Sequence, residues 1–282
     1  MNSGARRALL TVIVVAIAAA VAYWWWNGLH PGGTAPEPAV VAPPAPTASA
    51  AAVTPEVPAI QYPVQAPTST TPIEPAGIAA ALGDLLGAKT VSAFPEIGDF
   101  AHRFVATVDN LGRSYAPASL WPISPTPGRF TVQKRDDSTI ISADNGLRYA
   151  ALVLLAESVD AGKAVDLYLR MYPLLQRAYE DLGYPKGYFN DRLIAVMDLL
   201  LASPNPGYPV NLQLTDVKGT EPSLQPWVRY EFADPALESL TAGQKIMVRV
   251  GPVNERRLKA RLVALRKELL SRVVPHQVLK PR

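Results

Sequence analysis

Apolar residues recur at intervals of three and four along most of the C-terminal part of the chain, a period typical of amphipathic helices. The segment 189–202 is apolar around nearly its whole circumference, so we expect it to form the central, buried helix. Asp160 and Asn254 are suited to cap the helices that follow them, and Pro173 is expected to kink or interrupt its helix. The predicted helices cover residues 78–87, 95–111, 147–156, 161–182, 189–202 and a terminal segment with the seam Leu258, Leu262, Leu265 and Leu269.

Alternation of apolar and polar residues predicts a few short strands among these helices. Residues 129–133 and 139–142 flank a polar turn, and residues 210–217 and 227–232 are expected to pair with each other. Residues 246–250 fit a strand or a helix equally well. The predicted fold class is therefore mainly α, a helical globular domain with a few short β-strands.

A different pattern opens the chain, where residues 8–26 form 19 consecutive positions without a charge. A helix of this length spans about 28 Å, close to the thickness of the hydrocarbon core of a bilayer. Basic residues precede the run and a tryptophan cluster ends it, which predicts a cytoplasmic N-terminus at residues 1–7 and a tryptophan belt at the far interface. The expected anchor residues are Arg6, Arg7, Trp24, Trp25 and Trp26.

We therefore expect a single-pass helix in the bacterial inner membrane, with the rest of the chain in the periplasm. A cleaved signal peptide is the alternative, because Ala20-Val21-Ala22 fits the small-residue cleavage pattern. Four bulky aromatic residues directly after that site suit an anchor better than a mature N-terminus. Both interpretations place the bulk of the chain outside the cytoplasm.

Residues 27–75 hold 12 prolines and three charged residues in 49 positions, without any periodicity. Such a composition buries too little apolar surface to offset the entropy of ordering, so we expect a disordered, partly extended tether. A proline-rich ligand for the groove of a partner is the less favoured alternative. The predicted globular domain then comprises residues 76–282.

Composition removes several kinds of chemistry. The chain has no Cys, which excludes disulfides and Cys-ligated metals, and its three His are too few for a His-rich metal site. It contains no phosphate-binding, dinucleotide-binding, nucleophile-elbow, zinc-protease or penicillin-binding motif, so we expect no cofactor and no metal. Residues 256–282 carry a net charge of +8. We expect the leucine seam of this helix to dock on the domain or a partner while the charges face outward. The outward cations suit the helix dipole and the acidic body, or contact an anionic surface, and not nucleic acid, because the helix lies outside the cytoplasm.

Several short motifs, taken in order, resemble the bacterial family catalogued as domain of unknown function 3014. The similarity covers about residues 78–270, and it implies an N-terminal membrane segment followed by a proline-rich stretch. The family brings no known activity. The motifs are Val108-Asp109-Asn110-Leu111, Asn145-Gly146-Leu147-Arg148-Tyr149, Tyr172-Pro173-Leu174-Leu175-Gln176, Leu182-Gly183-Tyr184-Pro185, Gly187-Tyr188-Phe189-Asn190-Asp191-Arg192 and Ala242-Gly243-Gln244-Lys245.

Polar and aromatic residues crowd together in some of these motifs, which makes them candidates for ligand binding. They can bind an anion or a glycan, and Asp109, Glu180 and Asp191 can supply a carboxylate pair for glycoside cleavage. The structural alternative is favoured: Asn190 or Asp191 caps a helix, Arg192 pairs with Asp181, and another Arg pairs with Asp109. The candidate residues are Asp109, Asn145, Arg148 (the expected partner of Asp109), Tyr149, Tyr188, Asn190, Asp191, Arg192, Gln244 and Lys245.

Two functions of different classes follow. The favoured one is a membrane-tethered envelope protein whose outer domain binds a protein or a cell-wall glycan without catalysis. The alternative is an envelope hydrolase that cleaves glycan or peptide through carboxylates. The missing nucleophile and metal motifs favour the binding protein.

Overall fold

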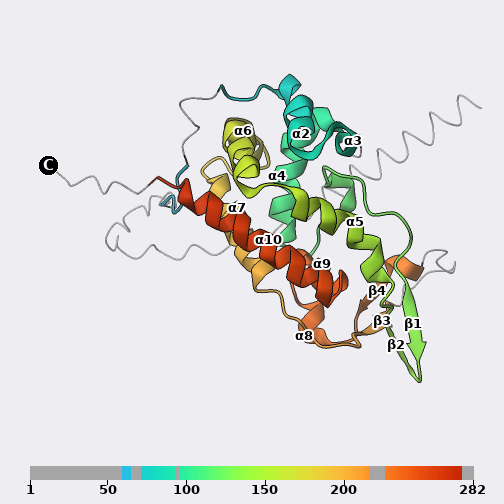
Figure 1. The fold of residues 1–282 in the computed structure, drawn as a ribbon. Coiled ribbons are helices and arrows are strands. Elements are labelled where there is room, and N and C mark those ends of the chain that lie inside the picture. Colours follow the sequence, from blue (N-terminus) through green and yellow to red (C-terminus); the bar gives the residue numbers. More distant parts are fainter. Residues whose placement is uncertain (1–58, 65–70, 93, 95, 216–225, 275–282) are drawn as a thin grey trace, which may run out of the picture. The chain divides into compact units, whose positions relative to one another are not determined.

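A computed structural model describes residues 59–64, 71–92, 94, 96–215 and 226–274 (Figure 1). The expected membrane helix over residues 8–26 and the anchor residues around it lie outside these ranges. Among the residues that are described, no helix is both long and apolar enough to cross a membrane.

Helices make up most of the described chain, and four short antiparallel strands accompany them, so the mainly helical fold class is confirmed. Most helices begin and end close to the predicted residues. The α-helices of the described residues are α2 (Ile78–Leu86), α3 (Ala88–Val91), α4 (Phe100–Leu111), α5 (Asn145–Ser158), α6 (Ala161–Asp181), α7 (Phe189–Leu201), α8 (Pro235–Glu238), α9 (Ala242–Arg249) and α10 (Pro252–Ser271).

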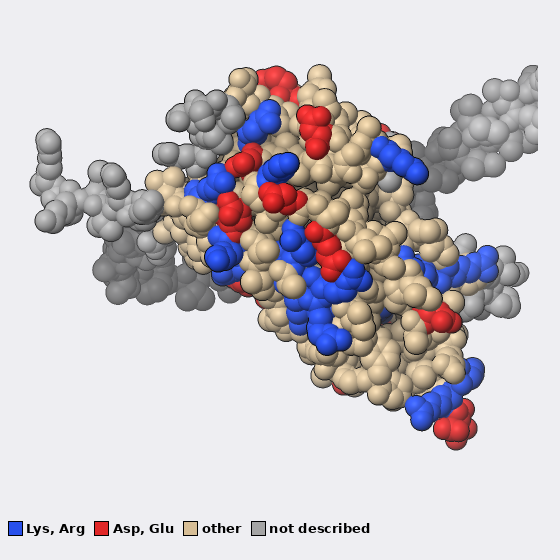
Figure 2. Space-filling view, in the orientation of Figure 1, with Lys and Arg blue, Asp and Glu red and all other residues tan. Residues whose placement is uncertain are grey.

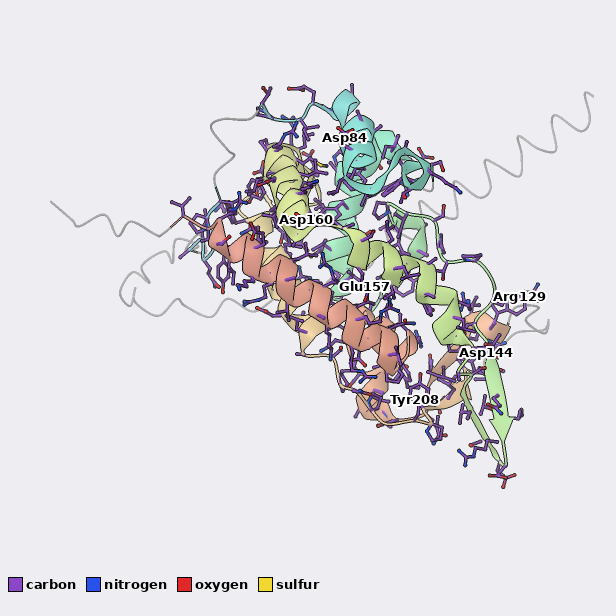
Figure 3. All side chains as sticks on the ribbon, viewed as in Figure 1. Asp84, Arg129, Asp144, Glu157, Asp160 and Tyr208 are labelled. Atoms are coloured by element: carbon purple, nitrogen blue, oxygen red, sulfur yellow. The ribbon has the colours of Figure 1, made fainter. Side chains whose placement is uncertain are left out.

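The helix ends follow the predicted capping residues in part. Asp160, at the start of α6 (Figure 3), accepts a hydrogen bond from the Lys163 backbone N–H at 2.9 Å, as predicted. Pro173 lies inside α6, which continues to Asp181 without a break. The prediction that Asn254 caps the terminal helix is wrong. It is the third residue of α10, and its amide joins α10 to α5 by donating to the Gly146 carbonyl at 2.8 Å.

The strands form one antiparallel sheet with the order β1-β2-β3-β4, which confirms the predicted pairing of the last two. The first hairpin turn is shorter than predicted, because Asp136 takes a left-handed conformation with φ 52° and leaves Lys134 and Arg135 free to pair. The ambiguous segment 246–250 belongs to α9 and its C-cap. The strands are β1 (Val132–Arg135), β2 (Ser138–Ile141), β3 (Asn211–Leu214) and β4 (Tyr230–Phe232).

Helices α2, α4, α6, α7 and α10 share the main core, and α7 lies in its middle with contacts to α4, α6, α9 and α10. Phe189, Ile194 and Val196 of α7 are almost inaccessible to solvent, which agrees with the prediction of a central helix. Ala195 and Asp198 are nevertheless exposed, so α7 is not buried on all sides. A smaller core, built around Ile141, Leu212 and Phe232, packs the sheet against α8 and α9.

The leucine seam of α10 faces the domain as predicted, with Leu269 buried and the other three leucines half-buried. The expectation that its cations face outward is wrong for two of them. Arg257 donates to Glu157 of α5 at 2.7 Å, and Arg261 donates to the Ala156 carbonyl at 3.1 Å. Basic and acidic side chains are consequently mixed on this face (Figure 2), and Glu157 lies beside α10 (Figure 3). Contact of the helix with an anionic surface stays a prediction.

Residues 59–64, here called the strap, fall within the predicted tether but pack on the helical domain. Val64 forms an antiparallel bridge with Val273, and the Val274 N–H donates to the Pro63 carbonyl at 2.9 Å. Further along, buried Ile73 donates its N–H to the Arg170 carbonyl of α6 at 3.1 Å. The folded domain therefore begins before residue 76, the predicted boundary, because backbone groups of the predicted tether form hydrogen bonds with the helices.

Candidate functional site

Four of the motifs that resemble the family come together where the C-terminal end of α4 contacts α7 and α9. Helices α7 and α9 also contact each other. Gly243, in the first turn of α9, permits this close approach. A Cβ at this position would lie 2.6 Å from the Leu200 side chain and 2.9 Å from the Leu111 carbonyl oxygen. The glycine of the Ala242-Gly243-Gln244-Lys245 motif therefore serves helix packing.

Asp109 is the buried centre of this region, with only 3% of its surface exposed. One carboxylate oxygen accepts from Arg192 Nε at 2.9 Å. The other is 2.7 Å from an Arg113 guanidinium nitrogen and accepts from the Tyr184 hydroxyl at 3.2 Å. Two of the expected pairings are wrong, because Arg192 binds Asp109 and not Asp181, and Arg148 contacts a different part of the chain.

The Asp109 carboxylate at the centre of this cluster has oppositely charged and hydrogen-bonding partners. Attraction to Asp109 raises the pKa of Arg113, and burial raises the pKa of the nearby Tyr179 hydroxyl. Both oxygens of the carboxylate are occupied by positively charged or hydroxyl donors. The cluster therefore ties the end of α4 to α7 and to the loop before it.

A second group of predicted residues lies at the first turn of α7 and binds the strap. Asp191 accepts the backbone N–H groups of Gln61 and Tyr62, at 2.9 and 2.8 Å, one on each carboxylate oxygen. The Asn190 amide donates to the Tyr62 carbonyl at 2.8 Å. The Tyr188 hydroxyl accepts from the Val64 N–H at 2.8 Å and donates to the carbonyl of the same residue at 3.4 Å. We call Tyr188, Asn190 and Asp191 the clamp.

Polar groups of α6 hold the clamp in position. Asn190 is fully buried, and the Tyr168 hydroxyl donates to its side-chain oxygen at 3.0 Å. Gln176 accepts from the Phe189 N–H at 2.9 Å and donates to the Gly187 carbonyl at 2.8 Å. Burial raises the pKa of both Tyr168 and Tyr172 above the ordinary value of 10.0, so both hydroxyls stay protonated donors.

The expectation that Asn190 or Asp191 caps the helix is wrong. Tyr188 occupies the N-cap position of α7, without a side-chain capping bond, and the next residue already belongs to the helix. The polar side chains at the start of α7 are thereby free to point to the strap. Asp191 presents acceptors to two successive N–H groups, Asn190 presents a donor to a carbonyl, and Tyr188 presents both an acceptor and a donor to Val64. The clamp is therefore complementary to the main-chain groups of a peptide segment.

The remaining candidates lie elsewhere and serve the fold. Asn145 is buried and exchanges hydrogen bonds with the backbone of Thr131, which fixes the chain entering β1. Arg148 donates to the carbonyls of residues 127 and 128 and lies near the ring of Tyr149. The other two candidates act at α8 and α9: Gln244 completes a capping box at the start of α9, and Lys245 pairs with Glu238 at 2.5 Å.

Sequence reasoning missed the strap, since proline content alone assigned residues 59–64 to the tether. One signal was available: Tyr62 is the single aromatic residue in the segment 27–75. Tyr168, which supports the clamp, follows the apolar period of the helix predicted over 161–182, so the sequence indicates only a core position for it. Within the described ranges, no group of three or more His, Asp or Glu side chains is placed to hold a metal ion.

Comparison with known proteins confirms the resemblance found in the motifs. The family model described as "Protein of unknown function (DUF3014)" matches residues 100–266, a span that includes Asp109, the clamp and Gly243. No curated protein and no solved structure matches the chain significantly. Because the family model matches more than half of the chain, this protein belongs to the DUF3014 family of proteins of unknown function.

Proposed function

We propose that this chain is a membrane-tethered binding protein of the bacterial cell envelope, whose helical domain binds a short peptide segment of a protein partner without catalysis. Residues 8–26 form a single-pass anchor in the inner membrane, residues 1–7 are cytoplasmic and the helical domain is periplasmic. The uncharged run, the two arginines before it and the tryptophans that end it support this topology.

The clamp is the observation that carries the binding function. Its three side chains make five hydrogen bonds to the strap, and all five reach main-chain N–H or C=O groups. Recognition of this kind depends on the spacing of peptide groups and not on side-chain identity. Of the two partner classes expected from the sequence, a protein and a cell-wall glycan, the clamp favours a protein.

A partner segment reaches the clamp by replacing the strap. The strap also bonds to the end of α10 through Pro63 and Val64, so an incoming strand finds both side-chain and strand-like partners. Because the exchange replaces each backbone hydrogen bond with one of the same kind, no buried polar atom of the clamp is left unpaired. The strap is then the resting occupant of the site.

The ion pairs and hydrogen bonds that already hold the candidate carboxylates support a binding function over the alternative of hydrolysis. Glycoside cleavage needs one carboxyl group to protonate the leaving group and a second to attack or to activate water. Asp109 is held by two arginines and a tyrosine, and both oxygens of Asp191 accept backbone N–H groups. Glu180 accepts from the Gln176 amide at 2.9 Å.

A peptide titration with full-length protein tests the proposal. In one variant, Gln61, Tyr62 and Val64 are replaced with Pro to unlock the clamp, because proline lacks the N–H groups that the clamp accepts, and a labelled peptide with the natural sequence of residues 58–65 is added. We expect the peptide to bind the unlocked variant at least tenfold more tightly than the natural chain, where the strap competes.

The matched control is the same peptide with N-methyl groups on the amides that correspond to Gln61 and Tyr62. N-methylation removes the two donors that Asp191 accepts and leaves the side chains unchanged. Equal binding of the two peptides, or binding that survives Asp191→Ala in the unlocked variant, would contradict recognition by the clamp.

A further inference from the structure

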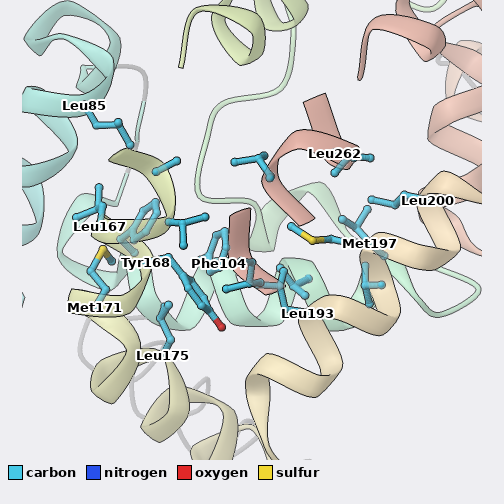
Figure 4. Close-up of a pocket in the computed structure, with 18 of the residues that line it drawn as sticks. Leu85, Phe104, Leu167, Tyr168, Met171, Leu175, Leu193, Met197, Leu200 and Leu262 are labelled. Carbon is cyan, nitrogen blue, oxygen red and sulfur yellow. The ribbon is translucent and has the colours of Figure 1, made fainter. Parts of the chain in front are cut away.

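A cavity of about 350 Å³ lies within the helical core, bounded by α2, α4, α6, α7 and α10 (Figure 4). In the close-up, Leu167 and Met171 of α6 lie on one side, Met197 and Leu200 of α7 lie on the other, and Phe104 of α4 lies between them. Eighteen of the 19 lining residues have hydrocarbon or thioether side chains. The volume is in the range of small-molecule sites.

The chemistry of the walls determines what can fill this space. The one lining hydroxyl belongs to Tyr168, and it already donates to Asn190 at 3.0 Å. Water needs two or more polar partners to occupy a cavity, and an apolar cavity left empty destabilises the fold in proportion to its volume. The cavity therefore suits an apolar occupant, and its volume holds about a dozen groups of the size of a water molecule or a methylene, at about 30 Å³ each.

A smaller hollow of about 220 Å³ adjoins the cavity and shares Leu85 and Leu167 with it. Two cations, Lys163 and Arg170, line this hollow. Among the described residues neither forms an ion pair, and the Arg170 Nε atom is buried without a hydrogen-bond partner.

Two carboxylates share the hollow with these cations. Asp166 is already paired with Arg272 of α10 at 2.8 Å, and Asp84 lies on α2 (Figure 3). Arg272 also pairs with Glu268 at 2.9 Å, so the charges around the hollow balance, and the preference for an anionic group rests on Lys163 and Arg170, which form no ion pair among the described residues. The apolar cavity and the two cations of the adjoining hollow together suit an amphiphile with one chain and an anionic head.

We propose that the cavity binds a single fatty acyl chain of about a dozen carbons, with its anionic head group at Lys163 and Arg170. The chain lies among the leucines of α6 and α7, where it replaces empty apolar volume. The guanidinium of Arg170 supplies the donor that the protein leaves unused. This site is independent of the clamp: Tyr168 lines the cavity and donates to Asn190, but no residue of the clamp lines the cavity, so each proposal can fail while the other holds.

Photo-crosslinking tests this site in the full-length protein reconstituted in lipid nanodiscs. The probe is dodecanoate with a diazirine near the end of its chain, and mass spectrometry maps the labelled peptides. We expect labels on α6 and α7, at least tenfold reduced by unlabelled dodecanoate and much less reduced by dodecanol, which lacks the charge. A lysophospholipid with a dodecanoyl chain is the second competitor: stronger competition than by dodecanoate assigns the site to a phosphate head group, and weaker competition assigns it to a carboxylate.

Two pairs of variants separate the cavity from non-specific partition. Ala164→Leu fills the cavity and should abolish labelling, while Ala195→Leu, at an exposed position of α7, should not change it. Lys163→Gln with Arg170→Gln should reduce labelling at least fivefold, and the exposed Lys186→Gln is its control. Because the two head-group substitutions lie at the rim, they test the site even if Ala164→Leu fails to fold. Labels spread over the surface, or labelling that ignores all these substitutions, would overturn the proposal.

Discussion

Asp109 of α4 and Arg192 of α7 are joined at two points, although 83 residues separate them in the sequence. The Arg192 Nε atom donates to the Asp109 carboxylate at 2.9 Å, and one Nη atom donates to the Asp109 backbone carbonyl at 2.7 Å. Gly112 leaves room for this contact, because a Cβ there would lie 2.7 Å from the guanidinium. The arginine thus satisfies both the carboxylate and a carbonyl at the end of α4.

Arg192→Ala should lower the free energy of unfolding by about 3 kcal/mol, the lower end of the range for breaking a buried ion pair. The lower end applies because Arg113 stays beside the buried carboxylate. Urea denaturation measures the loss. Arg266→Ala is the matched control, since its pair with Asp198 is exposed and should contribute less than about 1 kcal/mol. Equal losses in the two variants would contradict the central role of Asp109.

Gly243→Ala should destabilise the domain by about 1–3 kcal/mol, because the new methyl group meets Leu200 and the rigid Leu111 carbonyl. Gly83→Ala is the matched control within α2, where no atom lies within 4 Å of the added group. That change should stabilise the helix by about 0.5–1 kcal/mol. Thermal and urea unfolding of both variants would show opposite signs, and a neutral Gly243→Ala would refute the close helix approach.

High pH should unfold the domain through its buried tyrosines. Because burial raises the pKa of Tyr168 and Tyr172, the folded state holds these protons more tightly than the unfolded chain does. Their contribution to stability is complete below about pH 10 and is lost as the pH rises further. Urea titrations between about pH 9 and 11.5 should show a shallower loss of stability in Tyr168→Phe. The exposed Tyr115→Phe should keep the slope of the natural chain.

The proposed membrane topology predicts which reporter fusions are active. A reporter that is active only in the cytoplasm, fused after residue 58 and thus before the strap, should be inactive, and one that is active only in the periplasm should work at the same position. Cell fractionation should recover both fusions with the inner membrane. Activity of the cytoplasmic reporter would overturn the topology, and recovery in the soluble fraction would indicate cleavage of the leader.

Periodicity and capping residues were sufficient to predict α2, α6 and α7, because local spacing sets which face of a helix is buried. The Asp160 cap was predictable for the same reason, since its partner lies three residues away. The pairing of Asp109 with Arg192 was not, because several arginines could reach a carboxylate and only the packing of α4 on α7 selects one.

The strap and the cavity were beyond the sequence for different reasons. The proline content around Tyr62 predicts a disordered tether, and composition does not indicate that a few peptide groups of this segment bind specific partners on α7. The cavity depends on volume that the side chains of five helices leave unfilled, and periodicity describes which residues face inward but not how well they fill the space.

Hydrogen exchange at the amides of Gln61, Tyr62 and Val64 tests the central claim most directly, because the clamp accepts these three N–H groups. The measurement uses the natural full-length chain, with and without a saturating peptide of residues 58–65. We predict slow exchange in the free protein, and faster exchange of all three amides once the peptide displaces the strap. Exchange that stays unchanged while the peptide is bound would place the peptide elsewhere and contradict the clamp as the partner site.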